Sequence, residues 1–171
     1  MTISATGQTM HDAEGGCTCR RLRYRIAGKP LFVHCCHCRW CQRETGSAFV
    51  LNAMIEADRV HLLTGEVRII DTPSNSGKGQ LIARCPQCFV ALWSTYAGAG
   101  ELLRFVRVGT LDAPDALAPD VHIFTASKQP WVQLPAGVPA SAGYYKPAEL
   151  WPKESLDRYT ALMQHASRAP G

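Results

Sequence analysis

The sequence predicts one mainly β domain that ends in a single helix. Three observations support this fold class. The 171-residue chain is 46% hydrophobic, which suits one domain with a sizeable core. Its 11 prolines and 14 glycines divide it into short segments, most of which have the character of strands. Only the last segment has a clear helical period.

The strand predictions rest on alternation and on turn residues. Residues 22–27 alternate apolar side chains with arginines, which is typical of a half-buried strand. Residues 60–70 predict two strands joined at the two-residue turn Thr64-Gly65. Further strands are expected at residues 49–56, 80–85, 102–109 and 121–124. We expect these short strands to be antiparallel.

The two ends of the chain are predicted to differ. Apolar residues recur at helical spacing after Pro152, which predicts a helix over about residues 153–165. Residues 1–14 are polar and are predicted to be a flexible leader, so a single domain would span residues 15–171. The Pro-rich segment 112–120 is interpreted as a loop within that domain.

Composition and charge exclude several classes of protein. The formal net charge is +4 and the basic residues are scattered, so we expect no nucleic-acid partner. No run of eighteen apolar residues occurs, so no membrane-spanning helix is expected. The N-terminus lacks a signal-peptide pattern, which favours a cytoplasmic protein. Because cytoplasmic thiols stay reduced, the eight cysteines indicate metal binding before disulfides.

Two cysteine pairs far apart in the chain predict a structural zinc site. Cys17 and Cys19 are one residue apart, so both sulfurs face one side of an extended chain. The glycines at residues 15–16 allow a tight backbone approach just before them. Cys85 and Cys88 form the C-x-x-C half of a zinc knuckle, and the two pairs together give a closed tetrahedral site. The alternative is a redox C-x-x-C, but no thioredoxin-like helix pattern follows it.

A third set packs four cysteines into the seven residues from Cys35 to Cys41. Cys36, Cys38 and Cys41 can bind one zinc ion from one side and leave its fourth position open, as in a catalytic zinc site. The alternative is a second closed site in which a histidine is the fourth ligand. The candidate histidines are His34, His37 and His122. Spacing alone favours neither interpretation.

Four segments together resemble a known family. "GGCTCRRLRY", "HCCHCRWCQRETGSAF", "ARCPQCFVALW" and "HIFTASKQPW" are similar in sequence and order to the glutathione-dependent formaldehyde-activating enzyme family, also called the CENP-V/GFA domain. The resemblance spans residues 15–131 and implies a β-tent-like fold with two zinc ions. It implies that the structural zinc is held by Cys17, Cys19, Cys85 and Cys88, and the catalytic zinc by Cys36, Cys38 and Cys41. The implied activity is the addition of glutathione to formaldehyde, a carbon–sulfur lyase-type reaction.

Three positions depart from the family pattern. The residue that follows each outer cysteine pair is usually glycine, but here it is Arg20 and Phe89. Glycine at such positions often provides a positive φ or a close approach, so both turns are predicted to be locally altered. Cys35 is additional to the pattern, and its expected role is that of a small buried side chain.

The open site suggests how the implied reaction would proceed. A zinc-bound thiol is deprotonated, so the sulfur of glutathione held there would attack the carbonyl carbon of a small aldehyde. Arg39 and Arg43 could bind the carboxylates of glutathione, although solvated surface arginines are the alternative. Trp131 could wall the pocket, and His122 could be a general base or a pocket contact. The alternatives for these two are core packing and an ordinary strand histidine.

Two other functions fit the same ligand sets. A non-catalytic zinc-binding interaction module would have two closed sites, and Arg21, Arg23 and Arg25 would give it one basic strand face without interleaved aromatic residues. A thiol-redox enzyme would keep a low-pKa, alkylatable cysteine after zinc loading. The expected partners are glutathione and a small aldehyde, with two zinc ions per chain. No pattern in the sequence indicates an oligomeric state.

Overall fold

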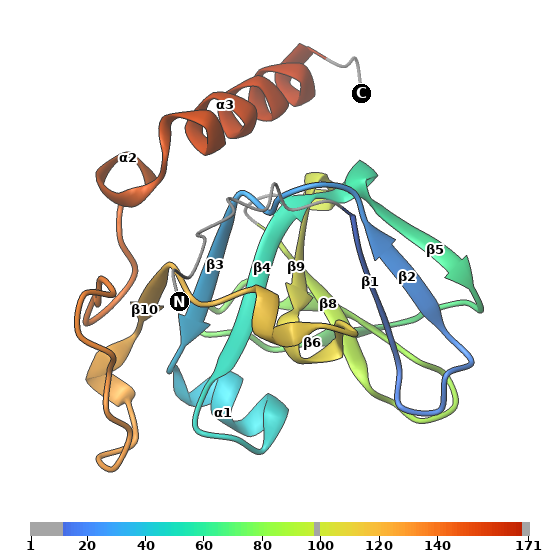
Figure 1. Ribbon diagram of the computed structural model, residues 1–171, viewed down its shortest axis with the longest axis horizontal. Helices are drawn as coiled ribbons and strands as arrows, with labels where there is room; N and C mark the ends of the chain where they lie inside the picture. The colour runs from blue at the N-terminus through green and yellow to red at the C-terminus, as the bar shows by residue number, and fades with distance from the viewer. Residues whose placement is uncertain (1–11, 98–99, 169–171) are drawn as a thin grey trace, which may run out of the picture.

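The computed structural model describes residues 12–97 and 100–168, and two β-sheets form most of this part of the chain (Figure 1). The smaller sheet has the strand order β1-β2-β5, and the larger sheet has the order β10-β3-β4-β9-β8-β7-β6. The strands are β1 (Ala13–Gly16), β2 (Arg23–Ile26), β3 (Phe32–Cys36), β4 (Val50–Glu56), β5 (Val60–Thr64), β6 (Arg68–Thr72), β7 (Gln80–Arg84), β8 (Ala91–Tyr96), β9 (Leu103–Arg107) and β10 (Val121–Ile123). The predicted mainly β fold with a C-terminal helix is confirmed.

The chain enters the small sheet earlier than the sequence predicts. Residues 1–11 of the expected leader lie outside the described residues, and β1 begins at Ala13. A side chain would not fit at Gly15, because its Cβ would lie 2.5 Å from the backbone oxygen of Thr110 and 2.7 Å from the hydroxyl of Tyr24. The close backbone approach expected before the first cysteine pair is therefore confirmed at this glycine.

The segment after β4 contains two strands, as predicted, but they do not pair with each other. β5 pairs with β2 in the small sheet, and β6 pairs with β7 in the large sheet. Gly65 between them has φ 76°, and a Cβ there would lie 2.5 Å from the backbone oxygen of Arg21. The turn therefore carries the chain from one sheet to the other instead of closing a hairpin.

β10 runs parallel to its neighbour β3, whereas the other pairings between the described strands are antiparallel. Its register places Val121 opposite His34 and Ile123 opposite Cys36. The expectation of antiparallel strands is wrong for β10. The physical reason is its connection: it reaches the sheet edge by a crossover from β9, and crossovers can deliver a parallel strand where hairpins cannot.

Two apolar cores lie on opposite faces of the large sheet. The first lies between the sheets, where the rings of Tyr24 and Trp93 meet edge to face with centroids 5.7 Å apart. The second lies beneath the C-terminal helix and includes three cysteines of the central motif. β4 separates the two cores, because Ala53 and Ile55 belong to the first and Met54 belongs to the second.

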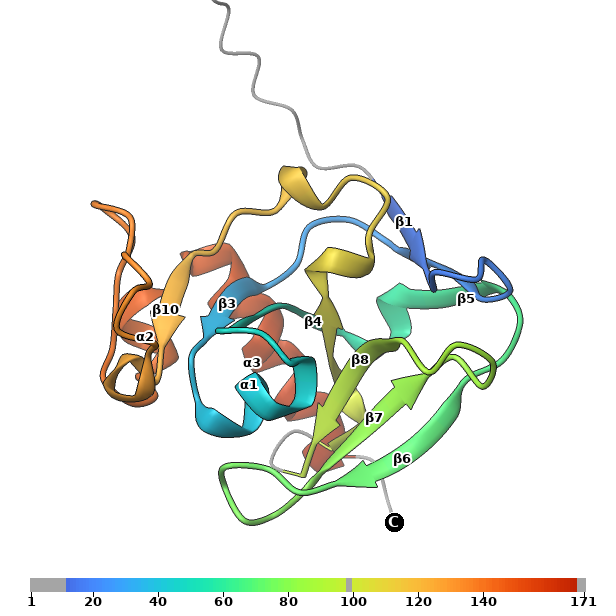
Figure 2. The same cartoon turned by 90° about the horizontal axis from the view of Figure 1, so that it is seen from below.

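Two of the three described α-helices lie at opposite ends of β3. The α-helices are α1 (Arg39–Thr45), α2 (Pro147–Leu150) and α3 (Lys153–Arg168), and short 3-10 turns occupy Ala57–Arg59, Gly100–Leu102, Val108–Thr110, Pro114–Ala116 and Thr125–Ser127. In Figures 1 and 2, α1 lies beyond one end of β3 and α3 lies across the opposite end. The helix predicted over residues 153–165 is α3. Among the described helices, none has the length and apolar character needed to cross a bilayer.

A buried ion pair attaches α3 to the large sheet. Arg158 donates from Nε and Nη2 to the two carboxylate oxygens of Glu56, at 2.9 and 2.6 Å. Its Nη1 also donates to the backbone oxygen of Lys29 at 2.9 Å. The side chain of Glu56 is only 8% exposed, so this charge depends on its partners for the solvation it has lost.

Arg158→Ala is expected to lower the free energy of unfolding by about 2 kcal/mol, because it leaves a buried carboxylate without its two-point partner. Urea denaturation followed by circular dichroism measures this change. Lys153→Ala is the matched control, because Lys153 forms an exposed pair with Asp157 on the same helix and should give no measurable change. Equal effects of the two variants would show that the ion pair with Glu56 does not fasten the helix.

Candidate metal centres

All eight cysteines of the chain, together with two histidines, gather in three groups of metal-binding side chains. Within each group the donor atoms lie within 4.8 Å of one another. The outer group is Cys17, Cys19, Cys85 and Cys88; the middle group is Cys36, Cys38 and Cys41; the cysteine–histidine group is Cys35, His37 and His122. The outer and middle groups bring together the residues that the sequence proposed as zinc ligands.

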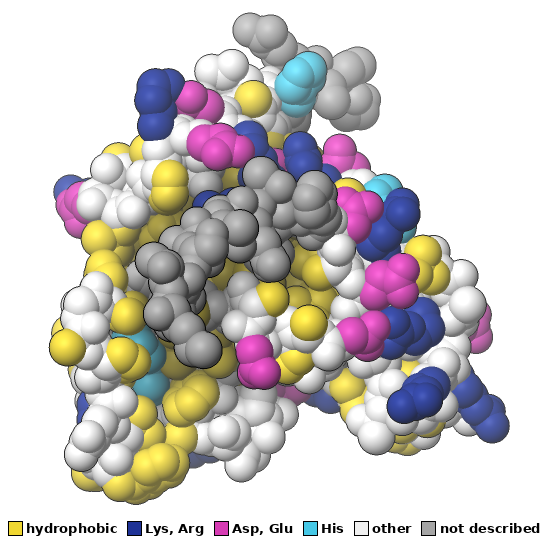
Figure 3. All heavy atoms as spheres, in the orientation of Figure 1, with side chains coloured by type: hydrophobic (Ala, Val, Ile, Leu, Met, Phe, Trp, Pro, Cys, Tyr) yellow, Lys and Arg dark blue, Asp and Glu magenta, His cyan; other side chains and the backbone are white. Residues whose placement is uncertain are grey.

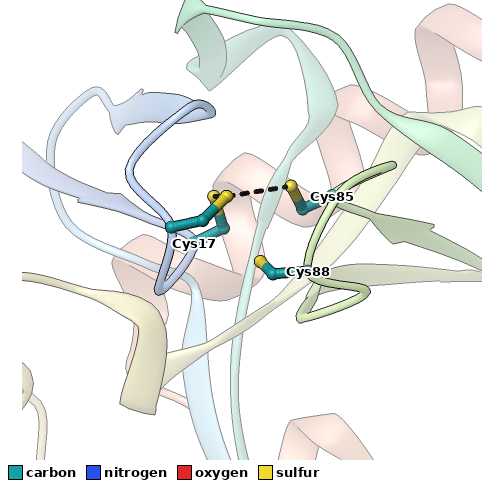
Figure 4. A group of neighbouring side chains, drawn as sticks. Cys17, Cys85 and Cys88 are labelled. Atoms are coloured by element: carbon teal, nitrogen blue, oxygen red, sulfur yellow. Dashed lines mark hydrogen bonds between the residues drawn. The ribbon is translucent and has the colours of Figure 1, made fainter.

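The outer group joins the tips of two hairpins, one from each sheet (Figure 4). Cys17 and Cys19 lie between β1 and β2, and Cys85 and Cys88 lie between β7 and β8. The sulfurs of Cys17 and Cys19 are 3.4 Å apart, and those of Cys19 and Cys85 are 3.7 Å apart. Thiolates bound to one zinc ion at about 2.3 Å are roughly 3.8 Å apart, so the outer group fits tetrahedral zinc.

Backbone N–H groups point at the sulfurs of the outer group. Leu22 donates its N–H to Cys17 Sγ at 3.4 Å. The backbone N–H groups of Val90 and Cys19 lower the pKa of the Cys88 thiol to about 6. These bonds stabilise negative charge on sulfur, which is the form that binds a metal ion.

The two turns of the outer group have the backbone conformation expected where the family pattern has glycine. Arg20 has φ 61° and Phe89 has φ 58°, both in the left-handed region. The backbone N–H of Arg20 donates to the backbone oxygen of Cys17, and that of Phe89 donates to the backbone oxygen of Cys85, both at 3.0 Å. The altered residues therefore keep the turn geometry, at the cost of a strained conformation for a residue with a Cβ.

The end of β3 and the start of α1 build the middle group. Cys36 ends β3, Cys38 is the N-cap of α1, and the N–H of Cys41 donates to Cys38 Sγ at 3.3 Å. Hydrogen bonds from the Cys36 and Cys41 thiols, with the backbone N–H groups of Cys41 and Trp40, lower the pKa of Cys38. The three side chains are 4–8% exposed. Hydrogen bonding with Cys38 and burial raise the pKa of Cys36 and of Cys41, so Cys38 is the one thiol of the group whose thiolate is favoured. The group is a buried set of three sulfurs from one short segment, a donor set that fits zinc.

Sequence reasoning missed Arg107, a buried cation next to the middle group. It is 5% exposed, and it donates from Nη2 to Ser94 Oγ at 2.8 Å and from Nη1 to Asn52 Oδ1. Both of these partners are neutral, and the charge of Arg107 weakly opposes the rise in the pKa of Cys41 that Cys38 and burial cause. In the sequence, Arg107 is one residue of the strand predicted over residues 102–109, and nothing in that sequence indicates which face of the strand is buried.

Gln42 fixes the loop that carries the middle group. Its Nε2 donates to the backbone oxygens of His37 and Ser127, at 2.7 and 2.9 Å. Its Oε1 accepts from Arg39 at 2.8 Å and from Gln129 at 2.9 Å. One buried amide therefore ties α1 to the segment after β10. This role also had no signal in the sequence.

The histidines proposed as a fourth ligand do not join the middle group. His37 and His122 gather with Cys35, and His34 Nε2 lies 2.8 Å from the hydroxyl of Tyr145. Cys35 is 2% exposed, as expected of a small buried side chain, but it has metal-binding neighbours that the sequence did not indicate.

The residues proposed for a glutathione pocket lie in different environments. Arg39 and Arg43 are exposed on α1, and Trp131 is 73% exposed in the segment after β10. Figure 3 shows hydrophobic side chains gathered over this segment, at the lower left. His122 is instead buried at 5% exposure, with its Nδ1 3.0 Å from His37 Nε2. The structure therefore separates His122 from the exposed residues of the proposed pocket.

A cavity of about 520 Å³ lies between α1 and the turn that contains Cys88. Arg84 and Arg107 line it, and Val50 and Phe49 contribute apolar surface. Arg84 is paired with Glu44, which also lines the cavity. The cavity gives a small polar molecule access to the buried side of Arg107.

The arrangement of the cysteine groups agrees with a comparison of the chain with known families. The family model described as glutathione-dependent formaldehyde-activating enzyme matches residues 12–127. The chain belongs to this family. The matched span includes every cysteine of the outer and middle groups, and family membership makes the protein a relative of enzymes that activate formaldehyde in a glutathione-dependent way.

The assignment to the formaldehyde-activating family rests on this match alone, and two further comparisons stand beside it. No curated protein matches the sequence. Among solved structures, the chain is similar to the crystal structure of a Rhodobacter sphaeroides protein that was a structural genomics target. The two are 14% identical, with a TM-score of 0.47, and the match covers 62% of this chain and 96% of that one.

Cys17→Ser is expected to lower the free energy of unfolding by several kcal/mol, because metal binding by the outer group contributes to folding. Cys38→Ser, the same chemical change in the middle group, should leave a folded chain that holds less zinc. Thermal unfolding and metal analysis of both variants test this difference. If Cys38→Ser unfolds the chain as severely as Cys17→Ser, the middle group is a structural site and not an open one.

Arg20→Gly and Phe89→Gly are each expected to raise the free energy of unfolding by about 0.5–1 kcal/mol. Removing the Cβ relieves a left-handed strain of about 1–2 kcal/mol. The greater backbone freedom of glycine in the unfolded chain offsets about 0.5–1 kcal/mol of that gain. Arg21→Gly is the control, because Arg21 does not have a positive φ and should gain nothing. Chemical denaturation of the zinc-loaded proteins measures all three, and a loss of stability in the first two would contradict the strain.

Proposed function

We propose that the protein is a zinc-dependent enzyme that condenses glutathione with formaldehyde or another small aldehyde, in the manner of an S-(hydroxymethyl)glutathione synthase. This would make it a carbon–sulfur lyase. The observation that carries the proposal is the middle group. It offers three sulfurs from one side, and within the described residues no fourth metal-binding side chain joins them.

The middle group would hold the second of two zinc ions, and the outer group the first. Zinc bound by three cysteines supplies a centre with one open position, which accepts a thiol and favours its thiolate form. The chain prepares this position with its own groups. Cys38 is stabilised as a thiolate by the N–H of Cys41, and Gln42 holds the loop in place. Arg107 places a positive charge close enough to the middle group to act on Cys41.

In the proposed reaction the glutathione sulfur attacks the carbonyl carbon of the aldehyde. A carbon–sulfur bond forms and the carbonyl π bond breaks, so its electron pair moves to oxygen. That oxygen takes up the proton that the thiol has lost, and the product is the S-hydroxymethyl adduct. No oxidant or reductant is needed. Burial of the three cysteines keeps bulk water away from the reacting sulfur.

Glutathione also carries two carboxylates, which need cationic partners. Arg39 and Arg43 on α1 are exposed next to the middle group and are the partners that we propose. Trp131 adds an exposed aromatic surface in the segment that Gln42 ties to α1. We assign no contact with glutathione to His122, which is buried against His37.

The two rival functions have less support. An interaction module that binds nucleic acid would use the basic strand face at β2, but Arg23 lies 3.4 Å from Glu14 and pairs with Asp112 as well. Arg25 lies 3.6 Å from Asp12. A thiol-redox enzyme needs an accessible, low-pKa cysteine outside the zinc sites. Seven of the eight cysteines belong to the outer and middle groups, and Cys35 is 2% exposed with its pKa raised by burial to about 12. Such groups require reduced thiols, so we propose a cytoplasmic location.

Reduced glutathione is expected to bind the zinc-loaded protein with a stoichiometry of one, and Cys38→Ser should abolish this binding. Isothermal titration calorimetry measures both. S-methylglutathione is the matched control, because it keeps both carboxylates but has no thiol to donate. The zinc-loaded protein should also accelerate formation of the adduct above the uncatalysed rate.

Equal binding of glutathione and S-methylglutathione would mean that the carboxylates are recognised without the thiol, which contradicts the role of the middle group. Absence of glutathione binding to a protein that holds zinc in both groups would rule out glutathione as the thiol substrate.

A further inference from the structure

A third set of metal-binding side chains lies apart from the outer and middle groups. His37 Nε2 is 3.0 Å from His122 Nδ1 and 3.5 Å from Cys35 Sγ. The three residues are at most 5% exposed. Donor atoms at the corners of a metal site are about 3.3–3.6 Å apart when metal–nitrogen bonds are about 2.0–2.1 Å and metal–sulfur bonds about 2.3 Å. The separation of Cys35 Sγ and His37 Nε2 falls in this range, the two histidine nitrogens are slightly closer together, and all three donor atoms lie within 4.8 Å of one another.

The fold produces the group by strand alternation and register. Cys35 and Cys36 are adjacent on β3, so their side chains lie on opposite faces of the large sheet. His37 follows Cys35 by two residues and lies on the same face. The parallel register of β10 places His122 directly opposite Cys35. The cysteine–histidine group and the middle group are therefore on opposite faces of the same strand end.

Hydrogen bonding alone does not satisfy these three side chains. A ring nitrogen of neutral histidine has either one proton or one lone pair, so His37 Nε2 makes one good bond and not two. Cys35 Sγ and His122 Nδ1 both lie within hydrogen-bonding distance of that nitrogen, at 3.5 and 3.0 Å. The other ring nitrogens, His37 Nδ1 and His122 Nε2, are also buried without a hydrogen-bond partner, but they belong to the far side of each ring and an ion at this contact would leave them unchanged. A metal ion that accepts one lone pair each from Cys35 Sγ, His37 Nε2 and His122 Nδ1 would satisfy all three of the facing atoms at once.

We propose that Cys35, His37 and His122 form a third metal site, separate from the two zinc groups, which takes one copper or zinc ion through a thiolate and two imidazoles. The site goes beyond the condensation of glutathione with an aldehyde and does not depend on it. Soft thiolate and imidazole ligands select this class of ion and disfavour magnesium or calcium.

Charge balance favours the monovalent ion, Cu⁺. One thiolate and two neutral imidazoles leave a net charge of zero around Cu⁺ and of +1 around Zn²⁺. A net charge is costly to bury at a site whose members are 0–5% exposed. The nearby Lys128 adds a further positive charge that acts on His37. The same site would hold Zn²⁺ less tightly, and the test compares the two ions.

The test counts metal ions in the full-length protein. Protein loaded with zinc and then desalted is analysed by elemental mass spectrometry, and one equivalent of Cu⁺ is then added without oxygen while released zinc is measured. We expect two zinc ions per chain and one bound Cu⁺ without zinc release. Cys35→Ser should lose the Cu⁺ and keep both zinc ions. Three zinc ions in the native protein and two in Cys35→Ser would also support the site, with zinc as its ion.

Two further variants keep the result interpretable. His122→Asn removes a ligand from the other strand, so the third equivalent should disappear even if Cys35→Ser folds poorly. Cys38→Ser is the matched control, because it should lose one zinc ion and still bind Cu⁺ without further zinc release. The proposal is overturned if the native protein holds two zinc ions and added Cu⁺ either stays free or displaces zinc. It is also overturned if the third ion persists in both Cys35→Ser and His122→Asn.

Discussion

The four sulfurs of the outer group lie where the two sheets meet, and the two-sheet arrangement depends on this contact if they hold the metal ion that we propose. They link the tip of the β1–β2 hairpin to the tip of the β7–β8 hairpin, so the small sheet is attached to the large one at a second place besides the apolar core. Strands of four or five residues are short, and a three-stranded sheet built from them has little stability of its own. The link and the core around Tyr24 and Trp93 hold it in position.

The spacing of the cysteines within each short motif made their metal chemistry predictable. Most contacts between distant segments could not be predicted in this way. The middle group follows from how close its cysteines lie in the chain, and the outer group from the match of two short cysteine pairs. The sequence predicts that the turns after those pairs are altered, but Arg20 and Phe89 keep the positive φ that glycine would have. The gathering of Cys35 with His122 depends on β10 entering parallel to β3, and nothing near either residue indicates that register. The role of Arg107 also depends on strands that are far apart in sequence.

Several elements were missed for physical reasons that can be named. All five residues of β3 are buried, so its sequence lacks the alternation by which a half-buried strand is found. β1 ends in two glycines, which disfavour strands in general. They are needed here because Gly15 lies against the backbone oxygen of Thr110 and Gly16 against that of Leu22. α1 is capped by a cysteine where Ser, Thr, Asp or Asn is usual, so only Gly46, its left-handed C-cap, marked the helix.

The sequence distances within the three groups set an order in which the folding chain can acquire its metal ions. Ligands of the middle group span six residues, so a short loop brings them together and little entropy is lost. The outer group joins Cys19 to Cys85 across 66 residues, and His37 meets His122 across 85. These sites can form only after both hairpins or the β10 crossover are in place. A chain emerging from the ribosome therefore exposes a complete set of three cysteines long before the other two groups exist, and the middle group is the first that can meet a metal ion.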